Sequence, residues 1–383
     1  MLYFDYAATS PTDPRVLETF VQVSQQYFAN PSSVHPAGAT AAKLLQQARN
    51  QVADILHVDK KEIYFTSSGT ESNNWALQSL TKGQSRHRPE ANRVLLLSIE
   101  HPSILKQVDW LQAQGFEVHL LPVDQEGRID LVALKNTLDD RVCLLSTMAV
   151  NNEVGSIQPI DAIAKILKAY PQVVWHVDGV QAAAYHLDIL THPRIDALSL
   201  SAHKFSGMRG CGILMCRQRI HLSPLLFGGG QEAGLRSSTE NLAAIVASAK
   251  ALRLSQENIS QKRNDLKIMR QTITQTLENA GWTLFAQDAA AHHIICCALA
   301  PLPGEVLVHA FGQEGVMVST TSACSSRKQA DHHTLKAMGV PDKLSKSAIR
   351  ISLGADITPS QIQGLVTAIQ NITQKFKRDS VNS

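Results

Sequence analysis

Two groups of polar residues follow short apolar runs and could together do chemistry. His176-Val177-Asp178 follows Val173-Val174-Trp175, and Ser201-Ala202-His203-Lys204 follows the run from Ala197 to Leu200. Apolar runs of this length are typical of buried strands in an α/β sheet. A lysine can form a Schiff base with pyridoxal 5′-phosphate (PLP), while a carboxylate holds the pyridine nitrogen protonated so that the ring accepts electrons. Solvated loop residues are the alternative interpretation, and the pair alone leaves both open.

A second segment, from Thr66 to Asn74, follows a predicted strand and opens a predicted helix. Serine and threonine are good N-caps, and Glu71 suits the first helical turn. Gly69 and Thr70 would place unpaired backbone N–H groups where an anion could bind. An ordinary capped helix is the more frequent case for such a string. The lysine and the acid elsewhere in the chain favour a phosphate site.

Three further segments carry candidate site residues. Glu100-His101-Pro102-Ser103 closes the strand-like run from Val94 to Ile99, and a histidine there could stack on a ring, move protons or be structural. Asn152 could donate to a phenolate or carboxylate oxygen, but Asn-Asn is also common in turns. Arg350 lies in an apolar segment, where it could clamp a substrate carboxylate or make a structural salt bridge.

One of the six cysteines differs from the others. Cys324 lies in the small, polar and basic segment from Ser322 to Lys328, which indicates an exposed loop with neighbours that favour the thiolate. The other five lie in or beside apolar runs, where cysteine behaves as a small core residue. No pair has Cys-x-x-Cys spacing, so we expect no metal site. These five are Cys143, Cys211, Cys216, Cys296 and Cys297.

The elements that would position these residues alternate between strand and helix from about residue 63 to 217. This alternation predicts a mostly parallel sheet covered on both faces, with ligands bound beyond the carboxyl ends of its strands. Asp178 and Lys204 both lie at such ends. The seven predicted strands are Ile63 to Thr66, Val94 to Leu97, Phe116 to Val123, Val142 to Thr147, Val173 to Val177, Ala197 to Ser201 and Gly212 to Cys216.

The length of 383 residues suits two domains. We expect a large domain over residues 15–255 and a small domain from residues 1–14 and 256–383. A long helical stretch without proline or glycine, from about Asn241 to Ala280, spans the boundary, and a final helix ends near Lys377. Shorter candidate strands follow the long stretch, at His293 to Leu299 and Gly315 to Ser319.

Composition excludes several partners. The chain is 44% hydrophobic and 18% charged, and its formal net charge of +3 is too small to indicate nucleic acid or an anionic membrane surface. No apolar run is long enough for a membrane span. The first residues lack the basic and apolar regions of a signal peptide, so we expect a cytoplasmic protein.

Taken together, the segments resemble the cysteine desulfurase family, the NifS/IscS-like branch of the class V aminotransferases. The resemblance implies the PLP-transferase (aspartate-aminotransferase-like) fold, with a mixed seven-stranded sheet in the large domain and a smaller α+β domain. It covers nearly the whole chain in the family's order. The matching segments are Asp5 to Thr9, Asn30 to Ser33, Thr70 to Ser72, Glu100-His101, Asn151 to Glu153, His176 to Asp178, His203-Lys204, Gly228 to Gly230, Ser322 to Cys324 and Arg350 to Gly354.

By this resemblance, Lys204 carries PLP and later moves protons, and Asp178 pairs with the pyridine nitrogen. His101 stacks over the ring and takes part in proton transfer. The remaining cofactor-binding residues hold the ring oxygen and the phosphate: Gln181 and Asn152 for the oxygen, and Gly69, Thr70, Ser201 and His203 for the phosphate.

The resemblance also implies a substrate and partners. Thr239 matches a position that the family supplies to the phosphate of the neighbouring subunit, which implies a homodimer. Arg350, with Asn152, binds the carboxylate of L-cysteine, and Cys324 is the nucleophile. The implied reaction yields L-alanine and a persulfide on Cys324. A protein acceptor then takes the sulfur for iron–sulfur cluster assembly, tRNA thiolation or another pathway.

Departures from the family pattern leave the acceptor and some alternatives open. Ser326 to His333 is unusually basic and rich in histidine, and we hypothesise that it recognises an acidic or thiol-bearing acceptor. Selenocysteine lyase shares the fold and most of the site. A catalytically silent scaffold is a third interpretation, against which Lys204, Asp178, His101, Cys324 and Arg350 together argue.

Overall fold

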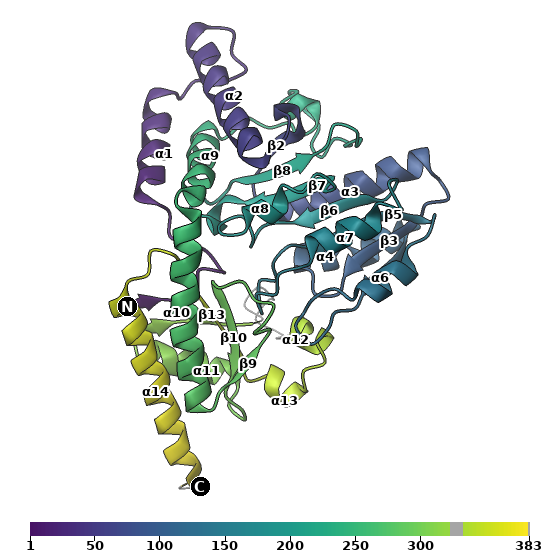
Figure 1. The fold of residues 1–383 in the computed structure, drawn as a ribbon. Helices are drawn as coiled ribbons and strands as arrows, with labels where there is room; N and C mark the ends of the chain where they lie inside the picture. The colour runs from purple at the N-terminus through teal and green to yellow at the C-terminus, as the bar shows by residue number, and fades with distance from the viewer. Residues whose placement is uncertain (322–331, 382–383) are drawn as a thin grey trace.

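The computed structural model describes residues 1–321 and 332–381, and only the backbone of residues 84–87 and 378–381. Figure 1 shows a large sheet with its covering helices, and below it a smaller group of strands flanked by two long helices. The N-terminal strand lies in the smaller part, so the chain begins there, crosses into the larger part and returns. Among the described residues, no helix combines the length and the apolar character that crossing a bilayer requires.

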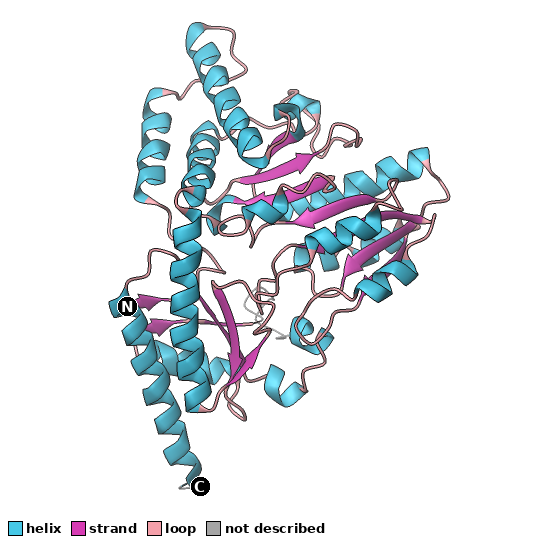
Figure 2. Ribbon diagram, viewed as in Figure 1, coloured by secondary structure: helices cyan, strands magenta, loops and turns pink. Residues whose placement is uncertain are grey.

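The large sheet has seven strands in the order β2-β8-β7-β6-β5-β3-β4. Figure 2 draws the strands in magenta and the helices around them in cyan. Neighbouring strands from β7 through β4 pair parallel, whereas β8 pairs antiparallel with both β7 and β2. This confirms the prediction of a mostly parallel seven-stranded sheet, with strand ends shifted by at most two residues. The strands are β2 Ile63–Thr66, β3 Arg93–Leu97, β4 Glu117–Leu121, β5 Val142–Met148, β6 Val174–Asp178, β7 Ala197–Ser201 and β8 Gly212–Cys216.

Helices cover both faces of this sheet. Successive residues of a strand point to opposite faces, so neighbouring apolar residues of β3 belong to different clusters. Val94 and Leu96 cluster with Trp75 of α3, whereas Leu95 belongs to the cluster that contains Val52 of α2. The prediction of a sheet covered on both sides is therefore confirmed. The helices of this part are α1 Pro14–Gln26, α2 Pro36–Leu56, α3 Gly69–His87, α4 Pro102–Leu105, α5 Val108–Ala113, α6 Leu131–Thr137, α7 Ile160–Leu167, α8 Leu187–Leu190 and α9 Leu242–Gln256, with 3₁₀ turns η1 Lys60–Glu62, η2 Ala202–Lys204 and η3 Glu232–Gly234.

The smaller part has a core of its own, in which Phe4 packs with Leu266 and Ile351. Its antiparallel sheet has the order β12-β13-β10-β9, and β1 pairs parallel with β11. The domain boundaries proposed from the sequence remain a prediction. The elements are β1 Leu2–Tyr3, α10 Ile259–Ala280, β9 Thr283–Phe285, β10 Ile294–Ala298, α11 Gly304–Gln313, β11 Val316–Met317, β12 Ser319–Thr320, α12 His333–Ala337, α13 Asp342–Ser345, β13 Ala348–Ser352 and α14 Pro359–Val381.

Two details of the predicted helices are corrected. The stretch from Asn241 to Ala280 forms two helices, because α9 ends at Gln256 and α10 begins at Ile259. Asn258 between them adopts a left-handed conformation with φ of 55°, which asparagine tolerates better than most residues, so neither glycine nor proline marks the break. The final helix α14 continues to Val381 rather than ending near Lys377.

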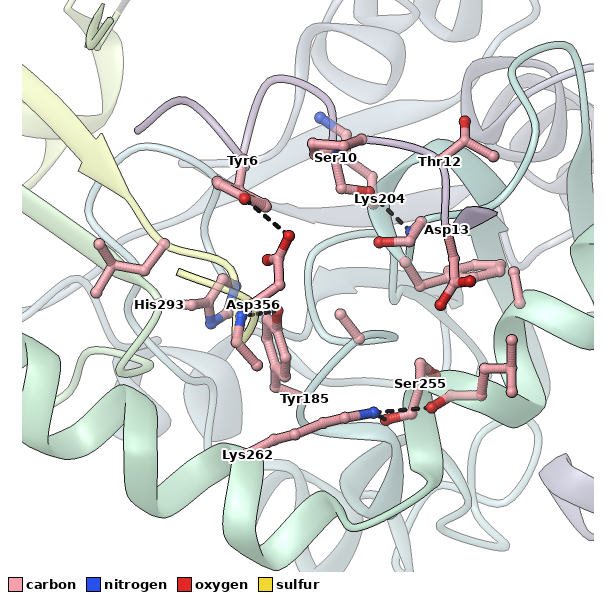
Figure 3. Close-up of a pocket in the computed structure, with 18 of the residues that line it drawn as sticks. Tyr6, Ser10, Thr12, Asp13, Tyr185, Lys204, Ser255, Lys262, His293 and Asp356 are labelled. Carbon is pink, nitrogen blue, oxygen red and sulfur yellow. Dashed lines mark hydrogen bonds between the residues drawn. The ribbon is translucent and has the colours of Figure 1, made fainter. Parts of the chain in front are cut away.

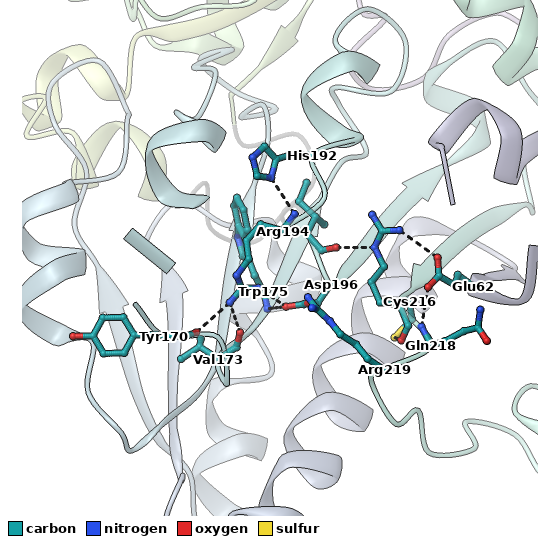
Figure 4. A network of polar contacts seen from close by, with 12 residues as sticks. Glu62, Tyr170, Val173, Trp175, His192, Arg194, Asp196, Cys216, Gln218 and Arg219 are labelled. Carbon is teal, nitrogen blue, oxygen red and sulfur yellow. Dashed lines mark hydrogen bonds and ion pairs between the residues drawn. The ribbon is translucent and has the colours of Figure 1, made fainter. Parts of the chain in front are cut away.

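A buried ionic network fixes the amino-terminal ends of β6 and β7 (Figure 4). Asp196, just before β7, accepts hydrogen bonds from the backbone N–H of Trp175 at 2.8 Å and from Arg194 at 2.6 Å, and it also pairs with Arg219. These bonds pair the buried carboxylate of Asp196, which would otherwise carry a large desolvation cost, and connect it to the backbone of β6. The carboxyl ends of the same strands, at the opposite edge, carry Asp178 and lead into Lys204.

Candidate active site

The carboxyl ends of β5, β6 and β7 open onto a cavity of about 200 Å³. The structure brings nearly all the predicted site residues together around it, although they come from six separate segments of the chain. Of the predicted site residues that the structure describes, only Thr239 is not among those that line it. The predicted residues that line the cavity are Gly69, Thr70, His101, Asn152, Asp178, Gln181, Ser201, His203, Lys204 and Arg350.

Asp178 and Lys204 are held on adjacent strands by different partners. Asp178 ends β6, where its Oδ1 accepts from the backbone N–H of Val180 at 2.9 Å and its Oδ2 accepts from Asn73 at 2.8 Å. Lys204 follows β7, and its Nζ donates to the backbone carbonyls of Ala7 and Ala8. The amino-terminal segment therefore crosses from the smaller part to position the lysine.

The predicted phosphate site lies where α3 begins. Gly69 is its first residue, and a Cβ there would lie 2.7 Å from Val180 Cγ2 and 3.1 Å from Ser201 Cβ. Only glycine fits without displacing these neighbours, so the backbone at the helix start stays open to the cavity. His203 beside it contacts Thr9 Oγ1 at 3.2 Å. Burial, with smaller effects from Lys204 and Arg209, lowers the pKa of His203 to about 4, so the ring is neutral at pH 7.

His101 lies at the start of α4 with two neighbours that sequence reasoning missed. Its Nδ1 contacts Ser103 Oγ at 2.8 Å and accepts from the Ser103 backbone N–H at 3.1 Å. Asn73 bridges Ser103 Oγ and Asp178. Asn73 is four residues after Gly69, so it shares that face of α3, and this spacing is the only signal that could have found it.

Arg350 makes the structural salt bridge that was one of its two interpretations, and its role as a substrate clamp stays a prediction. It is almost fully buried on β13, and its guanidinium donates to Asp5 Oδ1 and to the backbone carbonyl of Asn152, each at 2.8 Å. A structural salt bridge is therefore present. Because a guanidinium has five N–H donors, Arg350 keeps further donors for a ligand in the cavity that it lines.

Gln181 has a partner that the sequence did not predict. Its Nε2 donates at 2.9 Å to the carbonyl of Ala7, which also accepts from Lys204. Gln181 and Lys204 also line a larger neighbouring cavity of about 510 Å³. Figure 3 shows that cavity, with Tyr6 bonded to Asp356 on one side and Lys262 on another.

Two predicted site residues remain, Thr239 and Cys324. Thr239 lines a separate cavity of about 220 Å³ beside Arg236, whose guanidinium binds both carboxylate oxygens of Glu71. Cys324 lies outside the described residues. The other five cysteines are buried and free, as predicted. Burial raises the pKa of each of these thiols, to about 12 for Cys143 and about 11 for Cys211, so they remain protonated.

The residues around the 200 Å³ cavity fit PLP. Lys204 can bind the aldehyde, Asp178 can accept from the pyridine nitrogen, and Gly69 leaves the room that a phosphate needs. Asn73 Oδ1 is also buried there without a hydrogen-bond partner among the described residues, so it can accept from a bound group.

Comparisons with known proteins agree with this geometry. Residues 2–365 match the family model described as aminotransferase class-V. A "NifS/IcsS protein homolog" of Lactobacillus delbrueckii subsp. bulgaricus is 43% identical over 99% of this chain and 98% of its own. A "Cysteine desulfurase IscS" of Methanosarcina thermophila is 35% identical over 99% of this chain and 93% of its own.

The fold has a close counterpart among solved structures. A protein titled "NIFS-LIKE PROTEIN" superposes with a TM-score of 0.91 and is 33% identical, over 97% of this chain and 99% of that one. The family match extends over most of the chain, and the relatives align over nearly their full lengths. The chain therefore belongs to the class V aminotransferase family of PLP enzymes, in its NifS/IscS-like branch.

Proposed function

We propose that this chain is a PLP-dependent cysteine desulfurase, which converts L-cysteine to L-alanine and transfers the sulfur to Cys324 as a persulfide. The observation that carries the proposal is the single cavity that joins Asp178, Lys204 and Arg350. An acid, a lysine and a buried arginine there match a cofactor that activates an amino acid and a clamp that binds its carboxylate. The name of the Methanosarcina thermophila relative supports the choice of reaction.

PLP, when bound, supplies an electron sink that stabilises negative charge at the substrate Cα. The residues of this chain orient the cofactor and the substrate and move the substrate proton. Asp178 would accept a hydrogen bond from the pyridine nitrogen, and its bonds from Val180 and Asn73 hold the carboxylate in place for that contact. Lys204 Nζ takes and returns the proton at Cα. Arg350 binds the substrate carboxylate and so fixes which end of the amino acid faces the lysine.

The sulfur step needs a thiolate outside the cofactor site. In the proposal, the Cys324 thiolate attacks the substrate sulfur, a sulfur–sulfur bond forms, and the Cβ–S bond breaks. The electron pair of that bond stays with the carbon skeleton, which gains a proton and leaves as alanine. Buried thiols with raised pKa values cannot take this role, and the five described cysteines are all of that kind.

The test compares the PLP-loaded protein with its Cys324→Ala variant. Addition of L-cysteine should shift the visible absorption band of the cofactor in both proteins, because Cys324 does not bind PLP. Alanine formation should fall at least 100-fold in the variant, and the persulfide, detected by mass spectrometry, should disappear. Equal alanine formation by the two proteins would overturn the proposal. Cys143→Ala, which removes a thiol far from the sheet's carboxyl edge, controls for loss of any cysteine.

The same assay separates the alternative functions. A selenocysteine lyase would release selenide rapidly from L-selenocysteine and form little alanine from L-cysteine. A silent scaffold would bind PLP and form alanine from neither amino acid. The proposed desulfurase should form alanine from L-cysteine and lose this activity with Cys324.

We further propose a homodimer, in which Thr239 reaches the phosphate of the neighbouring subunit, and a protein acceptor for the sulfur. Exposed apolar side chains support the dimer: Phe28, Val34 and Phe227 project from loops with more than four-fifths of their surface accessible.

The sulfur acceptor would serve iron–sulfur assembly, tRNA thiolation or another pathway. Reversing the charges of Arg327 and Lys328 should slow sulfur transfer to it without changing alanine formation. Unchanged transfer would contradict a role for these residues. The cytoplasmic location stays a prediction.

A further inference from the structure

A continuous chain of hydrogen bonds connects Asp178 to His101. Asp178 Oδ2 accepts from Asn73 Nδ2 at 2.8 Å, and the same amide nitrogen lies 2.9 Å from Ser103 Oγ. Ser103 Oγ in turn lies 2.8 Å from His101 Nδ1. Asn73 and Ser103 are buried, and all four residues line the 200 Å³ cavity.

The direction of each bond in this chain is fixed by chemistry. An amide nitrogen carries two hydrogens and only donates, so Asn73 gives one hydrogen to Asp178 and the other to Ser103 Oγ. Ser103 Oγ, which accepts from Asn73, then has its own hydrogen free to donate to His101 Nδ1. The hydroxyl therefore serves as a donor to the histidine.

A second donor to the same nitrogen comes from the backbone. The Ser103 N–H donates to His101 Nδ1 at 3.1 Å, because His101 caps the start of α4. A backbone N–H cannot reverse its role. Nδ1 therefore accepts from both groups of Ser103 and carries no proton, so the proton of the neutral ring is on Nε2.

We propose that Ser103 and Asn73 are positioning residues that hold His101 as a neutral Nε2–H hydrogen-bond donor, and that Lys204 rather than His101 exchanges the substrate proton. The inference rests on the proposed function and makes it more specific. A ring in this tautomer can stack and donate, but it cannot accept a proton at Nε2. Acceptance at Nδ1 would require both bonds from Ser103 to be broken.

The surroundings of His101 are consistent with a neutral ring. Burial lowers its pKa, and the charges of Lys204 after β7 and His333 on α12 add to this effect, whereas Asp178 at the end of β6 opposes it. The neighbouring Glu100 is fully buried, and burial together with the Asp178 charge raises the pKa of its carboxyl well above the usual range. Burial and the like charge of Asp178 thus disfavour the ionised form of Glu100, which is the form that would stabilise an imidazolium.

The first test reads the tautomer directly. Nitrogen-15 NMR of the PLP-loaded protein with labelled histidine, assigned by comparison with His101→Gln, should show an Nε2–H tautomer from pH 6 to 8. Ser103→Ala removes the hydroxyl donor and should shift part of the population toward Nδ1–H, whereas Ser103→Thr should restore the wild-type signal. Ser24→Ala, on the exposed face of α1, should leave it unchanged. An Nδ1–H tautomer, or a His101 signal that titrates near pH 6.5, would overturn the proposal.

The second test uses kcat/KM to decide whether His101 acts as a hydrogen-bond donor or as a base. Glutamine can donate from the same region of space but cannot act as a base, whereas phenylalanine can stack but cannot donate. His101→Gln should keep kcat/KM for L-cysteine within tenfold of wild type, and His101→Phe should lose at least 100-fold. If both variants lost kcat/KM equally, by 100-fold or more, His101 would be acting as a base and the proposal would be wrong. Because the NMR readout needs no turnover, it decides the tautomer even if the proposed reaction is wrong.

Discussion

At the scale of single residues, the site depends on side chains whose partners lie far away in the sequence. Asp178 and Lys204 could be predicted because each comes at the end of a buried strand, where ligands of α/β sheets bind. Asn73 and Ser103 were not predicted, since their roles arise only where α3, α4 and β6 meet and the spacing of Asn73 from Gly69 is a weak signal alone. Arg350 was predicted as a clamp or as a salt bridge, and only the fold revealed that its salt-bridge partner is Asp5.

Gly69 gives a prediction at this scale. Gly69→Ala places a Cβ 2.7 Å from Val180 Cγ2 and 3.1 Å from Ser201 Cβ, so the start of α3 must move away from the cavity. We expect the dissociation constant for PLP, measured by absorption titration, to rise at least tenfold. Gly312→Ala on α11 is the matched control, because nothing lies within 4 Å of its added Cβ. Equal PLP affinity of the two variants would show that the tight packing at Gly69 is unrelated to cofactor binding.

At the scale of elements, apolar periodicity was sufficient to predict the seven strands of the large sheet but not every break between helices. Buried strands form continuous apolar runs with polar ends, which leave a clear signal. The break at Asn258 leaves none, because it depends on one residue in a left-handed conformation. The central strands also bury polar groups that a pattern of apolar residues cannot explain. His176 in β6 is fully buried between Ser146 of β5 and Ser199 of β7, each at 2.9 Å from a ring nitrogen.

His176 predicts how stability changes with pH. Burial lowers its pKa from 6.5 to about 3, so the folded protein keeps the ring neutral where the unfolded chain binds a proton. Stability from this group is therefore complete above about pH 6.5 and is lost as the pH falls toward 3. Between pH 7.5 and 5.0, protonation of His176 in the unfolded chain should lower the free energy of unfolding by about 2 kcal/mol. Urea unfolding at the two pH values, with saturating PLP, measures this decrease.

The variant His176→Gln isolates this contribution. It should be less stable than wild type at pH 7.5, since it loses one of the two serine contacts, but its further loss down to pH 5.0 should be smaller by about 2 kcal/mol. His186 and His203, whose pKa values burial lowers to about 4, are present in both proteins and cancel in the comparison. An identical loss in the two proteins would mean that His176 does not control the acid sensitivity.

At the scale of the whole molecule, the amino-terminal segment joins the two parts at the active site. Its strand β1 pairs with β11 in the smaller part, and its next residues reach Lys204 and His203 in the larger one. Arg350 of β13 enters the same cavity from the smaller part. The site therefore requires both parts, which no single motif could predict. Thr239 lies outside this cavity, and its position is explained if a second copy of the chain completes the phosphate site.

The proposed dimer can be tested through the loop that leads to Thr239. Phe227 exposes 88% of its surface there, so burial against a second copy would remove a large apolar area from water. Phe227→Asp should raise the dimer dissociation constant at least tenfold, measured by sedimentation, and should weaken PLP binding, because Thr239 would leave the partner's phosphate site. Ile268→Asp, at a half-exposed position on α10, should leave both quantities unchanged. If Phe227→Asp stays dimeric with wild-type PLP affinity, this loop is not the interface. If it becomes monomeric and still binds PLP normally, Thr239 does not complete the phosphate site.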